Sequence, residues 1–538
     1  MDRRKFLRLG AVAPGMLLAN EFKVSTLLSA PRAQEEIVET SAGKIQGLTK
    51  GGVLAFKGIP YGAPTGGDSR FMPPGKPQPW SGVRDAFELG LRCPQSPSTL
   101  IPEVSAVDSK EPAGEDCLVL NVWTPRANRA HKRPVMVWLH GGGYSSGSSG
   151  YTIYDGANLA RNHDLVVVGI NHRLNVFGFL CLAEIGREKY AHSSNVGMLD
   201  IVAALEWVRD NIAAFGGDPG SVTIFGQSGG AGKVSTLMAM PSAKGLFHRA
   251  IIESRPGEKG VPRGEASAAA EEFLSRLGFK PTQIDQAQKL PMEQLVSAMR
   301  AGGVPGNASL RLEPTIDGLA LPWGMFDFKA TELSANIPVL TGSVETEVAF
   351  FPNQTLDPID DSTLHQKVKQ ALPKADDTQV DRLIAAYQMG RPGVGNTDLY
   401  LILASDATFR QGVLAEAERK SATEKAPAYM YYFTWHSPVR DGKLRAFHTL
   451  ETPFVFANLD AGKPMTGSGN DRAALSDRMS SAWAAFARTG NPNHAGLPRW
   501  PAFTSQERAT MIFNNNCKVV NDPNGDERKM LKSLLAGA

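Results

Sequence analysis

The sequence predicts an α/β fold in which a central, mostly parallel sheet is flanked by helices. Residues 135–139 and 165–170 are continuous apolar runs rich in β-branched side chains, a pattern typical of strands covered on both faces. Apolar residues then recur at helical spacing from Ile201 to Ile212. Strands that alternate with helices favour parallel pairing, because each connection crosses back over the sheet.

The other elements follow in order along the chain. We expect a strand at 221–225, a tight turn at 226–230 and a helix at 232–240, then strands at 249–253, 337–342 and 426–434, and a late helix at 472–488. Two mainly helical stretches, 264–303 and 357–410, lie outside the alternation. We predict that they are cap insertions over the functional site.

Composition and charge indicate one large globular domain. Of the 538 residues, 42% are hydrophobic and 21% are charged, which is ordinary for a soluble enzyme. The six basic and two acidic residues of 1–33 outweigh the whole net charge of +3, so the rest of the chain is nearly neutral. Nothing therefore indicates a nucleic-acid partner, and no later segment is apolar enough for a membrane span.

The N-terminal segment, residues 1–33, is similar to a twin-arginine export signal. Arg3 and Arg4 precede a modest apolar stretch, and cleavage after Ala33 would leave a domain of residues 34–538. The alternative is a basic, disordered N-terminus. We expect export to a bacterial periplasm or beyond.

The four cysteines are too few for a disulfide framework. Cys93 and Cys117 bracket a short polar segment and could close one loop, worth roughly 3 kcal/mol in the chain-entropy model. Cys181 lies in an apolar run and is expected to be a buried free thiol, whereas Cys517 has no evident partner. No Cys or His cluster has the spacing of metal ligands, so no metal or other cofactor is expected.

The strongest local motif is Gly226-Gln227-Ser228-Gly229-Gly230, between a predicted strand and a predicted helix. It matches the nucleophile elbow G-x-S-x-G of the α/β-hydrolase fold, which makes Ser228 the predicted nucleophile. A phosphate-binding loop is the alternative, because Lys233 follows closely. That reading fails, because Gln227 stands at the required first glycine and Val234 replaces the magnesium-binding Ser or Thr.

A glycine loop, His140-Gly141-Gly142-Gly143-Tyr144, follows the strand at 135–139. It is the HGGG type of oxyanion loop, in which backbone N–H groups approach a substrate oxygen without obstruction. We predict that the N–H groups of Gly142, Gly143 and Gly229 stabilise an oxyanion. One such donor is worth about 3–4 kcal/mol in the transition state. A flexible glycine turn is the alternative.

A serine nucleophile also needs a histidine base and an orienting acid, which follow it in the order acid, then histidine. Glu345 and Glu347 both come after the strand at 337–342. His436, His448 and His494 all lie downstream, and spacing alone does not choose among them.

Over most of its mature length the chain resembles the type-B carboxylesterase and cholinesterase family. The resemblance rests on Phe56-Lys57-Gly58-Ile59-Pro60-Tyr61, on residues 114–125, and on residues 195–200 and 215–219, which lead into the elbow. It implies Glu347 as the acid, five residues after the strand-end glycine, and His448 as the base, before the Glu-x-Pro-Phe-Val-Phe stretch at 451–456. It also implies the Cys93–Cys117 disulfide and a structural role for Glu451.

The chain departs from that family at several positions. Gln227 stands where the family often has Glu, and Gly229 where it often has Ala. The segment between Cys93 and Cys117 contains no Trp, so the aromatic platform that cholinesterases use for quaternary ammonium is missing there. Gln227 removes a negative charge from the substrate pocket, in which we also place Tyr144. No physical account of Arg255 emerges from the sequence.

These residues together predict a serine esterase that hydrolyses neutral carboxylic esters through an acyl-enzyme, with a small-molecule ester as its partner. A non-catalytic binding protein on the same fold is one alternative, because the family includes adhesion proteins. Hydrolysis of amides, carbamates or β-lactams is another, because attack and oxyanion chemistry are shared. The natural substrate and the oligomeric state stay open.

Overall fold

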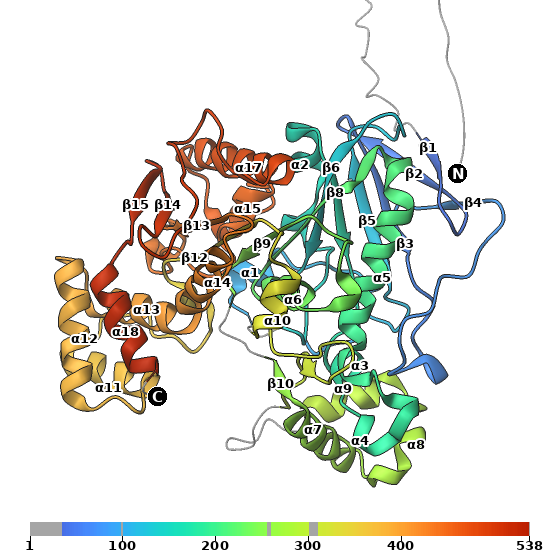
Figure 1. The fold of residues 1–538 in the computed structure, drawn as a ribbon, viewed down its shortest axis with the longest axis horizontal. Helices are drawn as coiled ribbons and strands as arrows, with labels where there is room; N and C mark the ends of the chain where they lie inside the picture. The colour runs from blue at the N-terminus through green and yellow to red at the C-terminus, as the bar shows by residue number, and fades with distance from the viewer. Residues whose placement is uncertain (1–34, 98–99, 256–259, 301–309, 326, 537–538) are drawn as a thin grey trace, which may run out of the picture.

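The computed structural model describes residues 35–97, 100–255, 260–300, 310–325 and 327–536. The segment predicted to be an export signal, 1–33, lies outside them. The chain forms a large twisted sheet with helices on both faces (Figure 1). In spatial order its strands are β1 (Glu35–Glu39), β2 (Lys44–Lys50), β3 (Val53–Pro60), β5 (Val119–Thr124), β7 (Val166–Ile170), β6 (Arg133–Leu139), β8 (Gly217–Gln227), β9 (Arg249–Glu253), β12 (Val339–Val344), β13 (Ala428–Phe433), β14 (Ala509–Phe513) and β15 (Lys518–Asn521), with β4 (Val83–Asp85) paired to β2.

The centre of the sheet is parallel and its two ends are antiparallel. The strands from β7 to β14 pair in parallel, whereas β1, β2, β3 and β5 at one end and β15 at the other pair antiparallel along the main order of the sheet. The short β4 pairs in parallel with β2. This confirms the predicted α/β fold. Strand β12 begins at Val339, two residues later than predicted, directly after Pro338, which has no N–H to donate to a ladder.

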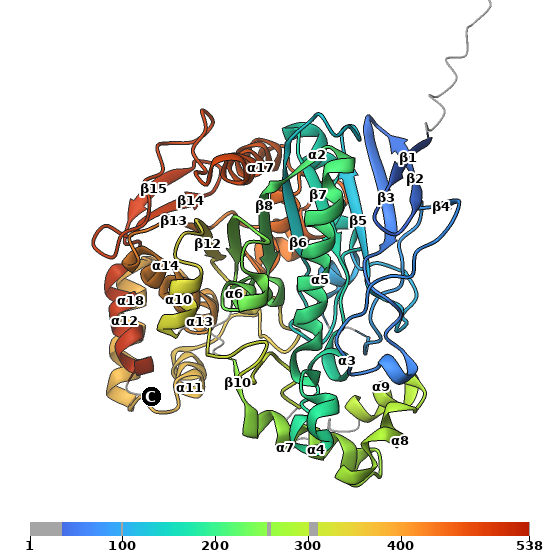
Figure 2. The same ribbon diagram turned by 45° about the vertical axis from the view of Figure 1, so that its right-hand side comes forward.

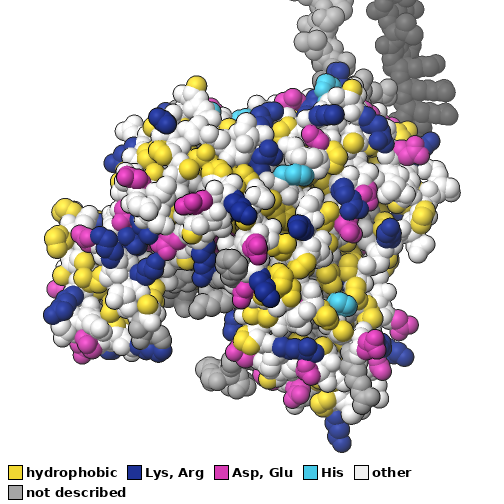
Figure 3. All heavy atoms as spheres, in the orientation of Figure 1, with side chains coloured by type: hydrophobic (Ala, Val, Ile, Leu, Met, Phe, Trp, Pro, Cys, Tyr) yellow, Lys and Arg dark blue, Asp and Glu magenta, His cyan; other side chains and the backbone are white. Residues whose placement is uncertain are grey.

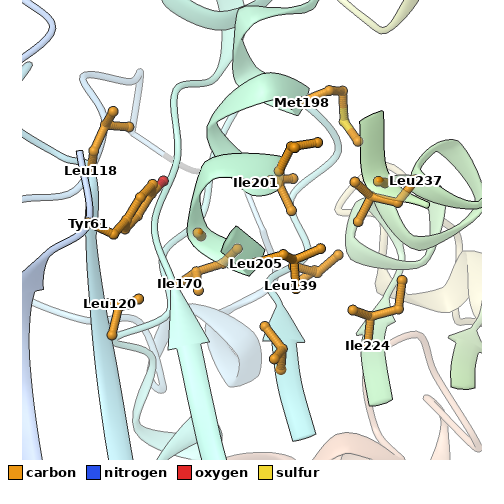
Figure 4. Close-up of a cluster of buried hydrophobic side chains, with 14 of the residues drawn as sticks. Tyr61, Leu118, Leu120, Leu139, Ile170, Met198, Ile201, Leu205, Ile224 and Leu237 are labelled. Atoms are coloured by element: carbon orange, nitrogen blue, oxygen red, sulfur yellow. The ribbon is translucent and has the colours of Figure 1, made fainter. Parts of the chain in front are cut away.

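Alternate side chains of β6 enter two different cores. Val135, Val137 and Leu139 pack in the cluster that contains Ile201 and Leu205 of α5 (Val196–Asn211), and Figure 4 shows Leu139 beside these two side chains. Met136 and Trp138 pack in the cluster that contains Trp483 of α17 (Asp471–Thr489). A strand points successive side chains to opposite faces, so a continuous apolar run is what two covered faces require.

The two predicted helical insertions form separate groups of helices (Figures 1 and 2). The first contains α7 (Arg263–Arg276), α8 (Ile284–Gln288) and α9 (Met292–Arg300), and the second contains α11 (Asp361–Ala371), α12 (Asp377–Gly390) and α13 (Asn396–Ser405). A π-helical turn, Asp406–Arg410, joins α13 to α14 (Gln411–Ala422). The remaining α-helices of the described residues are α1 (Pro102–Ser105), α2 (Ala157–His163), α3 (Asn175–Phe179), α4 (Ala183–Gly186), α6 (Gly229–Met238), α10 (Phe328–Leu333), α15 (Thr452–Val455), α16 (Lys463–Thr466) and α18 (Gly525–Ala536). Strands β10 (Val261–Pro262) and β11 (Thr315–Ile316) form a separate two-stranded sheet.

The cysteines correct one expectation. Cys93 and Cys117 are buried free thiols, so the expected disulfide between them is absent from the structure. The two side chains meet through a hydrogen bond instead, which together with burial raises the pKa of Cys117. The Cys93 sulfur also accepts the Leu174 N–H at 3.2 Å, so this sulfur is satisfied as a thiol. Cys181 is a buried free thiol, as expected.

The surface is mixed in charge. Figure 3 shows basic and acidic side chains interspersed over the visible face, in keeping with the near-neutral net charge. Among the described residues, no helix is long and apolar enough to cross a lipid bilayer.

Candidate active site

Ser228 lies at the turn between β8 and α6, with φ +59° and ψ −124°. A positive φ is uncommon outside glycine, so the turn holds this serine in a strained conformation. The flanking glycines are required by close backbone contact. A Cβ on Gly226 would lie 2.6 Å from the carbonyl carbon of Gly230, and a Cβ on Gly230 would lie 1.9 Å from the carbonyl oxygen of Leu139.

The glycine loop after β6 lies against this turn. A Cβ on Gly141 would lie only 3.5 Å from the Cβ of Ser228, and one on Gly229 would lie 2.2 Å from the carbonyl oxygen of Gly143. The second contact explains a departure from the family pattern, because alanine at position 229 would collide with the loop. Among the described residues, the N–H groups of Gly142, Gly143 and Gly229 have no hydrogen-bond acceptor. They therefore remain available to a substrate oxygen.

His448 and Glu347 form a buried pair. The Nδ1–H of His448 donates to Glu347 Oε2 at 2.5 Å, and the other carboxylate oxygen accepts the Val344 N–H at 2.9 Å. Their side chains are 3% and 0% exposed. Because a carboxylate only accepts, this bond places the proton on Nδ1 and leaves Nε2 as the basic nitrogen.

The other residues considered from the sequence lie elsewhere. Glu345 pairs with His436 at 2.7 Å and with Arg445 at 3.2 Å, in a partly exposed cluster. His494 Nε2 contacts the carbonyl oxygen of Arg478 at 3.0 Å. Of the three histidines, only His448 lines the same cavity as Ser228.

One cavity of about 830 Å³ connects these groups. Ser228, His448 and Gln227 line it, together with Tyr144 and the predicted oxyanion-loop glycines. Glu347 does not line it and lies behind His448. Both helical insertions contribute to its walls, through Arg276, Met299 and Arg300 from the first and Thr408 and Phe409 from the second. Its aromatic wall comprises Tyr144, Tyr151, Tyr154, Phe350, Phe351 and Phe409.

The imidazole of His448 packs against two aromatic rings that the sequence analysis did not identify. The ring centroids of Phe350 and Phe409 lie 5.1 and 4.9 Å from that of His448. Phe409 belongs to the π-helical turn, and π-turns are frequent at functional sites. Neither phenylalanine lies in a recognisable motif, and only the fold brings both to His448.

Gln227 places a neutral amide against the imidazole. Its Nε2 lies 3.2 Å from His448 Nε2, and its Oε1 accepts the hydroxyl of Thr449 at 3.3 Å. The side chain is buried, and it lines the cavity. The family's usual glutamate would add a negative charge at this point.

Two further carboxylates are buried near the site without lining the cavity. Burial raises the pKa of Glu253 to about 8, although Glu253 accepts the Trp483 indole N–H at 2.7 Å. Burial and the nearby Glu347 raise the pKa of Glu451, which accepts the Ser254 hydroxyl at 3.1 Å. Both positions suit structural anchors better than catalysts.

Arg255 is fully buried, its Nη2 donates to Met325 Sδ at 3.4 Å, and its side chain does not line the cavity. The part of the chain that the structure describes contains no group of His, Cys, Asp and Glu side chains suited to a metal ion.

Comparisons with known proteins agree with this geometry. A model of the carboxylesterase family matches residues 34–530. The para-nitrobenzyl esterase of Bacillus subtilis (strain 168) is 36% identical over 501 residues, which cover 92% of this chain and 98% of that protein. The phenmedipham hydrolase of Pseudarthrobacter oxydans is 34% identical over 490 residues, covering 89% and 95%. The crystal structure of a Geobacillus stearothermophilus carboxylesterase superposes with a TM-score of 0.80 at 36% identity, covering 92% and 99%.

Proposed function

The chain belongs to the carboxylesterase family and is an ester hydrolase, and from that premise we propose that Ser228, His448 and Glu347 are the catalytic triad by which it hydrolyses neutral carboxylic esters. One observation carries the proposal. Ser228 and His448 line the same cavity, and a fully buried Glu347 accepts the Nδ1–H of that histidine.

In the proposed mechanism, His448 Nε2 takes the proton of Ser228 while the serine oxygen attacks the ester carbonyl carbon. Glu347 fixes the imidazole tautomer and stabilises the imidazolium that forms. The imidazolium then gives its proton to the leaving alcohol. Water, activated by the same histidine, cleaves the acyl-enzyme and releases the acid.

The tetrahedral intermediate carries its negative charge on the former carbonyl oxygen. We assign the N–H groups of Gly142, Gly143 and Gly229 to this oxyanion, because they face the cavity at the elbow and have no acceptor among the described residues. The strained turn at Ser228 sets these donors before substrate arrives, so they need no reorganisation during the reaction.

The preference for neutral esters rests on the lining of the cavity. Gln227 contributes an amide where a glutamate would attract a cation. The described lining also carries two cationic side chains, Arg276 and Arg300, against one carboxylate, Glu313. A quaternary ammonium group would therefore meet a lining of net positive charge, which its cation–π contacts with the aromatic wall would have to offset. Matched neutral and choline esters of one acid should differ in kcat/KM by about tenfold or more, in favour of the neutral ester.

A fluorophosphonate probe and a simple aryl ester test the triad. The probe should label Ser228, and Ser228→Ala should lose both the label and the esterase activity. A wild-type protein that takes up no probe and hydrolyses no ester would favour a non-catalytic binding protein. Matched esters and amides would show whether the same triad also cleaves the harder bond.

Export to an oxidising compartment is part of the proposal. It rests on Arg3, Arg4 and the apolar stretch that follows them. The protein recovered from a bacterial periplasm or medium should begin near residue 34, and replacing both arginines by lysine should hold the full-length precursor in the cytoplasm. An unprocessed, cytoplasmic wild-type chain would contradict export.

A further inference from the structure

We propose that Lys233 is a positioning residue that holds the oxyanion loop in its productive conformation. The inference rests on the proposed function, because it concerns the stabilisation of the same oxyanion. Lys233 lies on α6, five residues after Ser228, and the phosphate-loop reading of the sequence gave it no role.

The lysine is buried completely, which is costly for an ammonium group unless the protein uses it. Its Nζ donates a hydrogen bond to the backbone carbonyl oxygen of His140 at 3.0 Å. That carbonyl immediately precedes Gly141, the first glycine of the loop. The side chain therefore reaches back beneath the start of α6 to the end of β6.

This hydrogen bond fixes one peptide plane. The His140–Gly141 peptide is planar, and in a trans peptide the N–H points opposite to the carbonyl oxygen. Holding the His140 oxygen therefore helps to set the direction in which the chain enters Gly142 and Gly143, which adopt positive φ angles of 95° and 61°.

The other end of the loop contacts the same ammonium group. Lys233 Nζ lies 5.7 Å from the ring centroid of Tyr144, within the range of a cation–π interaction. Tyr144 directly follows Gly143, and its ring packs edge-on against Phe179 at 5.2 Å. One side chain thus joins the residues on both sides of the three glycines.

Lys233 also supplies positive charge behind the loop. The neighbouring rings of His140 and His172 are stacked with centroids 5.0 Å apart. Burial lowers the pKa of both histidines well below the ordinary value, and the charge of Lys233 lowers it further, so both rings stay neutral. A buried cation on this side favours an anion forming at the glycine N–H groups.

Lys233→Met tests the role, because methionine has a similar length but neither charge nor donor. We expect kcat for a neutral aryl ester to fall about ten- to a hundredfold, with KM changed less than about twofold. The affinity for a trifluoromethyl ketone, which forms an anionic tetrahedral adduct with a nucleophilic serine, should fall by the same factor. Lys233→Arg, which keeps charge and donor, should recover part of the loss.

Thr236→Val is the matched control on the same helix. Thr236 is fully buried, and its hydroxyl bonds the Gly232 carbonyl of its own helix at 2.8 Å and Met325 Sδ at 3.2 Å. This variant should lose some stability and keep kcat. If Lys233→Met is insoluble, Lys233→Gln replaces it with the same expectation.

A Lys233 variant with wild-type kcat and wild-type ketone affinity would overturn the inference, as would an equal loss of kcat in Thr236→Val. Labelling of Ser228 by the fluorophosphonate probe separates this failure from failure of the proposed function. If the wild-type enzyme is labelled and active but substitution of Lys233 changes neither kcat nor ketone affinity, the inference about Lys233 is contradicted and the proposed function is not.

Discussion

Two glutamate–histidine pairs, whose glutamates are only two residues apart along the chain, differ in burial and in what surrounds them. Glu347 and His448 form a pair whose side chains are 0% and 3% exposed, behind a cavity that contains Ser228. Glu345 and His436 form a pair whose side chains are 14% and 41% exposed. The hydrogen-bond lengths, 2.5 and 2.7 Å, do not separate them.

The difference lies in what surrounds each imidazole. His448 packs against Phe350 and Phe409, contacts the Gln227 amide and lines the cavity, so its ring is restrained by neighbours as well as by Glu347. The carboxylate of Glu345 also forms an ion pair with Arg445, which in turn pairs with Asp398. A hydrogen-bonded acid–histidine pair can serve in catalysis only when it is buried, held in one orientation and close to a nucleophile. The hydrogen bond between the two side chains is not enough by itself.

The largest expected effect comes from removing the two histidines in turn. His448→Ala should lower kcat by about 10⁵- to 10⁶-fold, because the nucleophile loses its base. His436→Ala should leave kcat within about twofold of wild type. Steady-state hydrolysis of an aryl ester measures both effects. Comparable losses of kcat in the two variants would contradict the assignment of His448, rather than His436, as the catalytic base.

The two glutamates give the next largest contrast. Glu347→Gln should lower kcat by about 10³- to 10⁴-fold, because an amide no longer enforces the required tautomer or stabilises the imidazolium. Glu345→Gln is the matched control, with the same chemical change two residues away. It should retain activity and lose at most about 1 kcal/mol of stability. The reverse order of effects would move the acid to Glu345.

Loosening the packing around the catalytic ring should have a smaller effect. Phe409→Leu removes one of the two rings that hold His448 without touching its hydrogen bonds. We expect kcat to fall about tenfold with the fluorophosphonate label retained, because the imidazole samples unproductive orientations. Unchanged kcat across a series of acyl-chain lengths would show that Phe409 shapes neither the ring position nor the cavity.

The pH dependence of stability should distinguish Glu253, a buried carboxylate that has no histidine partner among the described residues, from Glu347. Burial raises the pKa of Glu253 to about 8 from an unfolded value near 4.5, so the folded state binds its proton more tightly. The resulting stabilisation is present below pH ~4.5 and is lost as the pH rises through 8, by about 5 kcal/mol. Glu253→Gln should flatten this part of the profile of melting temperature against pH. An unchanged slope would mean that Glu253 does not titrate in this range.

Much of the sequence interpretation depended on local patterns and was confirmed. The apolar runs at 135–139 and 165–170 became β6 and β7, and the strand at 249–253 was correct at both ends. The strand–turn–helix around Ser228 was also correct, although α6 starts at Gly229 rather than at 232. Such features follow from backbone geometry and from side-chain periodicity, which a sequence states directly.

Other features needed the assembled fold. The expected disulfide between Cys93 and Cys117 is not present in the structure, where both are free thiols. Their spacing along the chain does not determine which of the two states forms. The rings around His448 come from positions 350 and 409, which no motif connects. From the sequence, Lys233 has no role once the phosphate-loop interpretation is excluded. Only the structure shows that its ammonium group donates a hydrogen bond to the carbonyl oxygen of His140.

The sequence by itself determined the family, the parallel sheet, the elbow at Ser228 and the glycine loop, because each depends on residues adjacent in the chain. Tertiary structure decided which glutamate meets which histidine, and why position 229 is glycine. Those outcomes depend on distances between segments up to 101 residues apart in the chain, set by how helices and loops pack over the sheet.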